Sequence, residues 1–203
     1  MANTCCVDHV FYVDDRKDKA VLVKLRNLLR TAAKEADHTE RSPLNLAIQK
    51  ASGKDVPLEV AKQGRDYFTA VDVGAIPHLD DTKFTLEEET AWRACSGWDT
   101  LLTYFPGVSH AYVAFEPGCR VFEKVDDEGF FSDREYIVFM DEDTDEDASY
   151  GMEVGDADGL ISYLKETFGL GGEYHAEEVD EVIQTCKDIE TARNRVLEIY
   201  RFE

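Results

Sequence analysis

The chain has 203 residues, of which 43 are Asp or Glu and 22 are Lys or Arg, so its formal charge is -21, and 43% of the residues are hydrophobic. This composition is typical of a folded, water-soluble chain with one well-buried core, and it excludes wholesale disorder. The charge also excludes broad affinity for nucleic-acid phosphate or anionic lipid and favours basic partners.

The sequence carries no targeting or metal-binding signal. No stretch approaches the roughly 18 apolar residues that a membrane span needs, and the first residues lack a basic region followed by an apolar run. The cysteines are odd in number and lack C-x-x-C spacing, so neither a zinc site nor a disulfide framework is indicated. We therefore expect reduced thiols, a location in the cytoplasm of a bacterial or a host cell, and no cofactor. The cysteines are Cys5, Cys6, Cys95, Cys119 and Cys186.

Hydrophobic spacing in the first third predicts a strand followed by helices. Residues 7–13 have the character of a strand, and residues 15–36 carry an apolar stripe with helical period. A second, short helix begins after the cap residue Ser42 and ends at Gly53. A further strand is expected over residues 67–73.

Thr85 and Glu88 have the spacing of a capping box, which predicts a long helix from there to about Tyr104. Its apolar stripe includes Cys95 and Trp98. The helix is expected to end at the Phe-Pro-Gly sequence that follows.

The second half of the chain is predicted to contain three strands and two helices. Branched and aromatic residues favour strands over 110–116, 120–125 and 135–140, joined as an antiparallel meander, with the last strand central in the sheet. Helices are expected over 156–168 and 176–200.

The predicted fold is therefore α+β: a single domain over residues 1–203, with a mixed sheet that contains the antiparallel meander and is covered by amphipathic helices. The glycine-rich residues 169–172, before the last helix, mark the place where the domain could be subdivided.

Asp14 and Asp15 follow the first strand, and Val13-Asp14-Asp15 resembles the opening of a phosphoacceptor receiver domain. The resemblance covers about 25 residues and implies an acidic pair that helps to hold magnesium. It also implies an acceptor aspartate after a second buried strand, whereas Asp55 follows the polar residues 50–54. We therefore interpret the pair as acids that favour the start of the following helix.

The alternating aspartates of the sequence DEDTDED, residues 141–147, suggest a calcium loop. Counted from Asp141, the sixth position is Glu146 instead of glycine and the twelfth is Met152 instead of glutamate, so the segment is interpreted as a solvated acidic loop.

A cysteine enzyme would need a thiolate and a histidine, which Cys95 and His110 could supply. Cys95 lies on the predicted apolar stripe, where a small buried side chain is the usual role. The other histidines are dispersed, and no catalytic residue is predicted.

The negative charge is concentrated in one part of the chain. Residues 126–158 contain 14 acidic side chains and a single basic one, Arg134. Such crowding destabilises a fold through self-repulsion, so a function that rewards local negative charge is expected. Candidate apolar anchors beside it are Phe130, Phe131, Tyr136 and Tyr150, with a place in the core as the alternative.

We predict a non-catalytic acidic interaction protein that binds and occludes a basic surface of a partner, such as a nuclease or another nucleic-acid-binding protein. Its composition is similar to that of anti-restriction and anti-CRISPR proteins, although it shares no motif with them. The predicted partner-binding residues are Asp126, Asp127, Glu128, Asp141, Glu142, Asp143, Asp145, Glu146 and Asp147.

Two alternatives remain. A small metal-dependent enzyme or nucleotide-sensing domain would use the strand-end carboxylates Asp14, Asp15 and Asp141. An immunity-type or scaffold protein would recognise its partner by shape. The basic residues of the first helix form one stripe that we interpret as a solvated face: Lys19, Arg26, Arg30 and Lys34.

Overall fold

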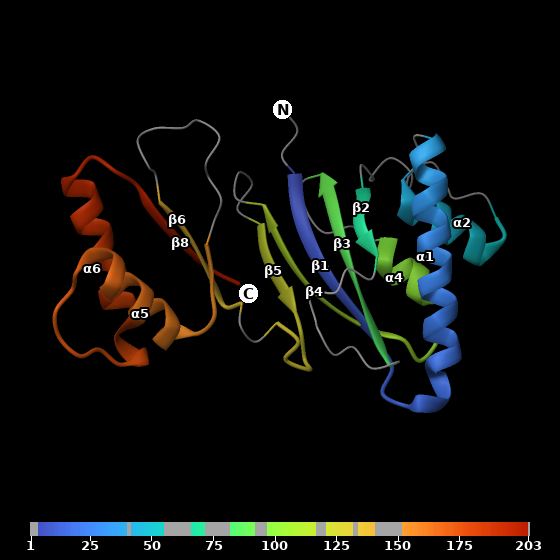
Figure 1. Cartoon of the computed structure of the whole chain (residues 1–203), viewed down its shortest axis with the longest axis horizontal. Coiled ribbons are helices and arrows are strands. Elements are labelled where there is room, and N and C mark those ends of the chain that lie inside the picture. Colours follow the sequence, from blue (N-terminus) through green and yellow to red (C-terminus); the bar gives the residue numbers. More distant parts are fainter. Residues whose placement is uncertain are drawn as a thin grey trace. The chain divides into compact units, whose positions relative to one another are not determined.

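The computed structural model describes residues 4–39, 42–54, 66–71, 82–91, 97–116, 121–131, 134–140 and 152–202. The chain divides into two compact units, Met1–Phe130 (unit 1) and Phe131–Glu203 (unit 2) (Figure 1). Each unit combines an antiparallel sheet with helices, which confirms the α+β class. Among the described helices, none is both long enough and apolar enough to cross a membrane.

Unit 1 is built on a five-stranded sheet with the order β2-β3-β1-β4-β5. Its strands are β1 (Thr4–Tyr12), β2 (Asp66–Val71), β3 (Lys83–Ala91), β4 (Ser109–Glu116) and β5 (Val121–Val125). One face is covered by α1 (Lys19–Thr39), α2 (Pro43–Ser52) and α4 (Gly97–Leu102), with the 3-10 helix η1 (Arg16–Asp18) leading into α1 (Figure 1).

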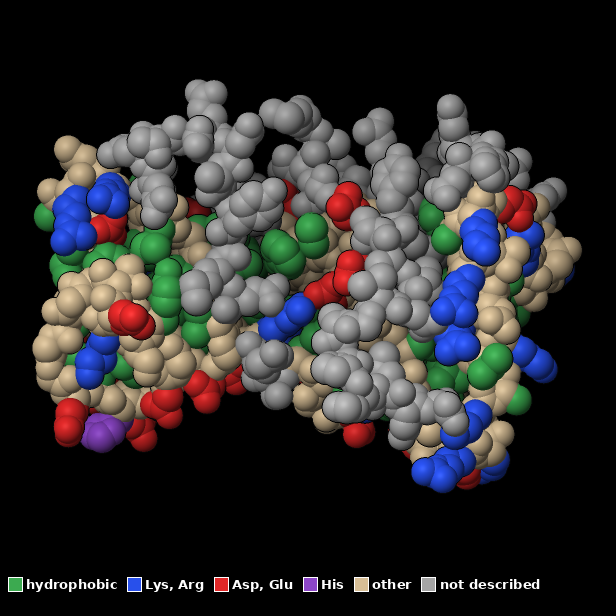
Figure 2. Space-filling model, viewed as in Figure 1, with side chains coloured by type: hydrophobic (Ala, Val, Ile, Leu, Met, Phe, Trp, Pro, Cys, Tyr) green, Lys and Arg blue, Asp and Glu red, His purple; other side chains and the backbone are tan. Residues whose placement is uncertain are grey.

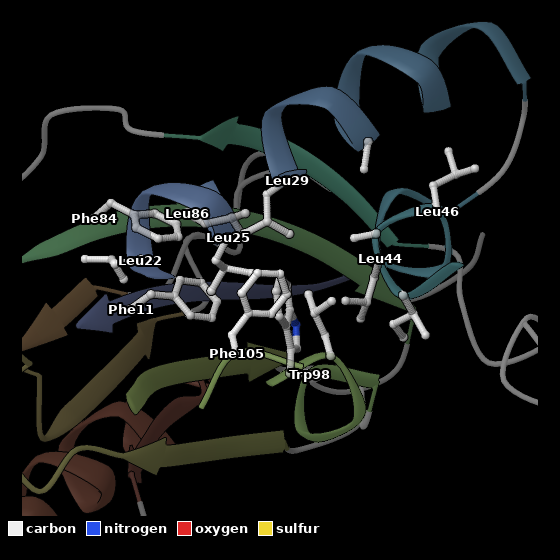
Figure 3. Packing of buried hydrophobic residues seen from close by; sticks show 14 of the residues in the cluster. Phe11, Leu22, Leu25, Leu29, Leu44, Leu46, Phe84, Leu86, Trp98 and Phe105 are labelled. Atoms are coloured by element: carbon white, nitrogen blue, oxygen red, sulfur yellow. The ribbon is translucent and has the colours of Figure 1, made fainter. Parts of the chain in front are cut away.

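The core of unit 1 lies between this face and the helices. The helical side chains of the core come from α1, α2 and α4 and include Leu25, Leu29 and Ala32 of the stripe predicted for the first helix. Alternate residues of β1 and β3 supply those of the sheet (Figure 3). Figure 3 labels Leu22, Leu25 and Leu29 of α1, Leu44 and Leu46 of α2, Phe11, Phe84 and Leu86 of the sheet, and Trp98 and Phe105.

The ends of α2 follow the sequence prediction. Ser42 accepts a hydrogen bond from the backbone N–H of Asn45 at 3.1 Å, and Pro43 occupies the first turn. Gly53 ends the helix with φ +67°, a left-handed conformation that glycine adopts without steric cost.

The helix predicted over residues 85–104 is wrong for its first part, because Lys83–Ala91 is the strand β3, and among the described residues of this range Gly97–Leu102 is helical. Alternate side chains of β3 are buried: Phe84, Leu86, Glu88 and Thr90. Nine residues of β3 pair with β1, so tertiary pairing overrides the local helix signal. Thr85 and Glu88 do not form a capping box.

Unit 2 has a three-stranded sheet with the order β7-β6-β8 and two helices packed on it (Figure 1). The strands are β6 (Tyr136–Met140), β7 (Met152–Val154) and β8 (Leu197–Arg201). The helices are α5 (Ala157–Phe168) and α6 (Val179–Ala192), and the 3-10 helix η3 (Ala176–Glu178) precedes α6. Asp156 caps α5 by accepting a hydrogen bond from the N–H of Gly159 at 2.8 Å.

Three details of the predicted topology need correction. β6 is central as expected, but in the sheet of unit 2, so it does not continue a meander with β4 and β5. Every described strand pairing is antiparallel, so the sheet expected to be mixed is not. The helix predicted over 176–200 ends at Ala192, because residues 197–201 pair with β6 after a turn in which Asn194 has φ +56°.

The division of the chain lies between Phe130 and Phe131, whereas residues 169–172 lie inside unit 2, where Gly169 ends α5. The expectation of a single domain stays a prediction.

Candidate functional site

The predicted partner-binding acids fall into two groups. Asp126, Asp127 and Glu128 lie in the turn after β5, with Asp127 and Glu128 exposed. Asp126 is half-buried and accepts a hydrogen bond from the backbone N–H of Phe130 at 2.9 Å, so it also shapes the turn. The other predicted residues lie outside the described residues: Asp141, Glu142, Asp143, Asp145, Glu146 and Asp147.

Unit 2 carries most of the net charge, since its 21 acidic and 6 basic residues give -15 of the total of -21. Figure 2 shows Asp and Glu side chains gathered along the lower edge of this unit. The exposed acids of its described part belong to α5 and its cap residue, to η3 and α6, and to the chain between these helices: Asp156, Asp158, Glu166, Glu173, Glu177, Asp180, Glu181 and Asp188.

Several basic side chains of unit 2 are engaged within it. Arg193 contacts the buried Glu190 at 2.9 Å, and Arg195 lies 3.8 Å from the second oxygen of that carboxylate. Lys165 lies over the Tyr174 ring, 5.6 Å from its centroid. These cations therefore act on local groups, and the ion pairs described for Arg193 and Arg195 go to the buried Glu190 and not to the exposed carboxylates.

The first turns of η3 and α6 show this lack of compensation. Glu177, Asp180 and Glu181 are exposed and make no ion pair within the part of the chain that the structure describes. Their place at a helix start is favourable, because the positive end of the helix dipole lies there. The helix dipole therefore explains in part why these three acids lie together.

The basic stripe lies on α1, as the helical spacing predicted. Lys19 and Arg26 are half-buried, and Arg30 and Lys34 are exposed. Lys and Arg side chains follow α1 in Figure 2.

Asp15 acts as a helix-start acid, in agreement with the sequence interpretation. Its carboxylate accepts a hydrogen bond from the backbone N–H of Lys17 at 2.9 Å and lies 2.9 Å from the Lys17 ammonium. Both contacts hold the pKa of Asp15 below its usual range. Asp14 is exposed beside it.

The residues proposed for metal or thiol chemistry do not form a site in the described chain. Within the described ranges, no group of three or more His, Cys, Asp or Glu side chains is arranged to hold a metal ion. Asp141, of the metal alternative, and Cys95, of the cysteine-enzyme alternative, lie outside those ranges.

Unit 1 contains a buried polar array that the sequence analysis missed. Nε2 of His9 lies 3.0 Å from Oε2 of Glu88, and Nδ1 of His9 lies 2.8 Å from Nε2 of His110. The indole N–H of Trp98 donates to the same Oε2 at 3.0 Å. We call Glu88, His9 and His110 the buried array.

Strand register brings the three side chains to one face of the sheet. His9 stands opposite Leu86 on one side, while His110 on the other side stands opposite Phe11. Glu88 stands opposite Val7, one inward position from His9. Directly opposed residues share a face and inward positions recur every second residue, so the array crosses three neighbouring strands.

Aromatic rings enclose the array and remove it from water. The Phe11 ring is parallel to that of His110 within 5°, at a centroid distance of 4.6 Å. The ring centroids of Trp98 and His9 lie 4.9 Å apart, and those of Tyr112 and His110 lie 5.3 Å apart. His9 and Glu88 are each 1% exposed, whereas His110 is partly exposed.

Burial favours the uncharged form of every member. It raises the pKa of Glu88 to about 7, although the hydrogen bond from Trp98 acts in the opposite direction. Burial lowers the pKa of His9 to about 3. The pKa of His110 is also held well below its usual value, by burial and then by His9. The contact between His9 and Glu88 is therefore a hydrogen bond between neutral groups at mildly acidic pH.

One atom of the array is unsatisfied. Oε1 of Glu88 is buried and has no hydrogen-bond partner among the described residues. A bare buried carboxylate oxygen is much more costly than the carbonyl oxygen of a neutral acid, which independently favours protonated Glu88.

No protein-family model matches this chain, and neither does any curated protein. A solved structure, "Crystal Structure of an Unknown Protein from Galdieria sulphuraria", aligns over 100% of both chains with 8% sequence identity and a TM-score of 0.25. A similarity this weak supports no conclusion about fold or function.

Proposed function

We propose that this chain is a non-catalytic interaction protein whose carboxylates bind a basic, nucleic-acid-binding surface of a partner protein and occlude it. The observation that carries the proposal is the charge of unit 2, which is -15, together with the internal use of Arg193 and Arg195 by the buried Glu190. Among the described residues, exposed acids such as Glu177, Asp180 and Glu181 make no ion pair, which supports a role in binding other molecules.

The physical advantage of such a surface is faster association. A concentrated negative field attracts a basic groove and raises association rates by roughly 10-fold to 1000-fold at low salt. It also competes with nucleic acid for the same groove, because both present closely spaced negative charges to it. The effect weakens as salt screens the charges.

Charge alone gives little affinity, so apolar contacts are also needed. Phe131 and Tyr136 are only 6% and 5% exposed, so they belong to the protein interior. Phe130 packs against the Tyr12 ring at 5.0 Å. Val125 is a better anchor, because it is 46% exposed and directly precedes the acidic turn at 126–128.

The experiment begins with capture of partners from the native host at low and moderate salt, followed by their identification. We expect basic proteins whose retention falls steeply with salt. The dissociation constant of a purified captured protein is then compared for two variants that each remove three negative charges. One changes the acidic segment 141–147 (Asp143→Asn, Asp145→Asn and Asp147→Asn), and its matched control changes unit 1 (Asp14→Asn, Glu89→Gln and Asp99→Asn).

The variant of the acidic segment should weaken binding about tenfold, from roughly 0.5 kcal/mol for each charge pair made with the partner. The control should change it much less. Equal weakening by both variants would mean that only net charge matters, and neutral or acidic partners would contradict the proposal outright.

A further inference from the structure

The buried array is a continuous hydrogen-bond chain with only two consistent proton arrangements. A neutral imidazole has one N–H donor and one acceptor nitrogen, so the bond at one nitrogen fixes the role of the other. Because both nitrogens of His9 are engaged, the state of Glu88 determines the state of His110.

In the first arrangement Glu88 is protonated. Its O–H donates to Nε2 of His9, and Nδ1–H of His9 donates to Nε2 of His110, which keeps its own proton on Nδ1. In the second arrangement Glu88 is a carboxylate. It accepts from Nε2–H of His9, whose Nδ1 accepts from Nε2–H of His110, and Nδ1 of His110 carries no proton. Trp98 donates to Oε2 of Glu88 in both.

We propose that Glu88, His9 and His110 form a proton relay that connects a buried carboxyl group to solvent through Nδ1 of His110. One proton moves from Oε2 of Glu88 to Nε2 of His9 while another moves from Nδ1 of His9 to Nε2 of His110. The proton on Nδ1 of His110 passes to water. The array as a whole loses one proton and gains one negative charge, and each N–O and N–N contact keeps its hydrogen bond.

The geometry provides a route for the proton. The distances of 3.0 Å and 2.8 Å are hydrogen-bond distances, so no side chain has to move. His9 and Glu88 are sealed from solvent, whereas His110 is partly exposed. Nδ1 of His110 has no partner within the described residues and is the outer end of the chain.

Burial of Glu88 sets the pH range in which the relay releases its proton. Oε1 of Glu88 makes the carboxylate costly without preventing it, since Trp98 still donates to Oε2. Burial raises the pKa of Glu88 to about 7, which places proton release near neutral pH. The two imidazoles stay neutral there, because burial holds their pKa values below the ordinary range.

Burial opposes a negative charge on Glu88, and the neighbouring titratable groups named below do not assist it. The helices α1 and α2 pack apolar side chains over this face of the sheet. The titratable neighbours that act on the array or on the adjoining Cys5 and Tyr112 are Asp8 of β1, Glu116 of β4, Glu123 of β5 and Asp99 of α4. All four are acidic, so ionisation of Glu88 relies on its hydrogen bonds.

The relay gives the surface of unit 1 a pH-dependent hydrogen-bonding group. Below about pH 7, Nδ1 of His110 is a donor and fits an acceptor such as a carboxylate or a carbonyl oxygen. Above it, the same atom is an acceptor and fits a hydroxyl group or an amine. This site is independent of the acidic surface in unit 2.

Nitrogen NMR of the full chain, with ¹⁵N in its histidines, tests the proposal between pH 5.5 and 8.5, because nitrogen shifts distinguish protonated from unprotonated imidazole nitrogens. We expect the proton of His9 to move from Nδ1 to Nε2, and that of His110 from Nδ1 to Nε2, with one shared midpoint near pH 7. Glu88→Gln should abolish both changes, whereas Glu89→Gln, at an exposed position of the same strand, should leave them intact.

If Glu88→Gln fails to fold, Trp98→Phe gives a second test, since loss of the indole donor should raise the shared midpoint. The proposal is overturned if the two histidines keep their protonation pattern across the range. It is also overturned if their midpoints differ, or if the change survives in Glu88→Gln.

Discussion

Replacing Glu88 by Gln isolates the part of the stability that depends on its protonation. Gln has nearly the same shape, and its amide oxygen can accept from the Trp98 indole and from Nε2–H of His9 as the carboxylate does, but it does not titrate. Burial raises the pKa of Glu88 from 4.5 to about 7. A group with a raised folded-state pKa contributes stability that is complete below its unfolded pKa and is lost as the pH rises through its folded pKa.

The size of this contribution follows from the two pKa values. At 1.36 kcal/mol for each unit of pKa, the total is about 3 kcal/mol, and about 2 kcal/mol of it disappears between pH 5.5 and pH 8. His9 acts in the opposite sense, because its lowered pKa gives stability above 6.5 that is lost as the pH falls towards 3. That contribution is common to both proteins and cancels in the difference.

Urea unfolding followed by tryptophan fluorescence reports on the stability of unit 1, which contains Glu88, because both tryptophans lie in that unit. The free energy of unfolding of the wild type, minus that of Glu88→Gln, should fall by about 2 kcal/mol from pH 5.5 to pH 8. The same difference for the exposed control Glu89→Gln should stay flat. If the difference in unfolding free energy between wild type and Glu88→Gln does not change with pH, the claim that Glu88 is buried in its protonated form is refuted.

Three further predictions concern packing and reactivity. Gly97→Ala should destabilise unit 1 by about 1 kcal/mol in urea unfolding, since a Cβ there would lie 2.9 Å from Cδ2 of the buried Leu44. An unchanged midpoint of urea unfolding would show that Leu44 of α2 moves aside without loss of stability. Asp156→Ala should lower the free energy of unfolding by about 1 kcal/mol, measured by circular dichroism, because α5 loses its cap. Asp158→Ala, which removes a nearby carboxylate and leaves the cap in place, is the control. Cys186 should resist thiol reagents at pH 8 until denaturant is added, because burial raises its pKa to about 11; rapid labelling of native protein at this position would contradict that.

Much of the fold could be predicted from the sequence, because periodicity and caps agreed with tertiary structure in β1, α1, α2 and α5. Prediction failed where a local signal conflicted with strand pairing. The capping-box spacing of Thr85 and Glu88 favours a helix, and only the pairing of residues 83–91 with β1 makes their two-residue alternation decisive. Residues 197–201 were likewise absorbed into the preceding helix, although they form the edge strand β8.

The buried array was missed for the same reason. Glu88 was interpreted as a capping residue, so its inward position in a strand could not be recognised. His9 and His110 were both on predicted strands, but their contact depends on the register of β1 against β4, which no local pattern reveals. A histidine at an apolar position of each strand was the one available signal.

The concentration of acidic residues in unit 2 needed only counting, but its function depends on a partner. The most direct test adds the chain to fluorescently labelled DNA bound to the captured basic protein and measures anisotropy. Occlusion predicts stoichiometric release of the DNA, and release should require more protein when Asp143, Asp145 and Asp147 are neutralised. DNA that stays bound while the two proteins associate would contradict the account.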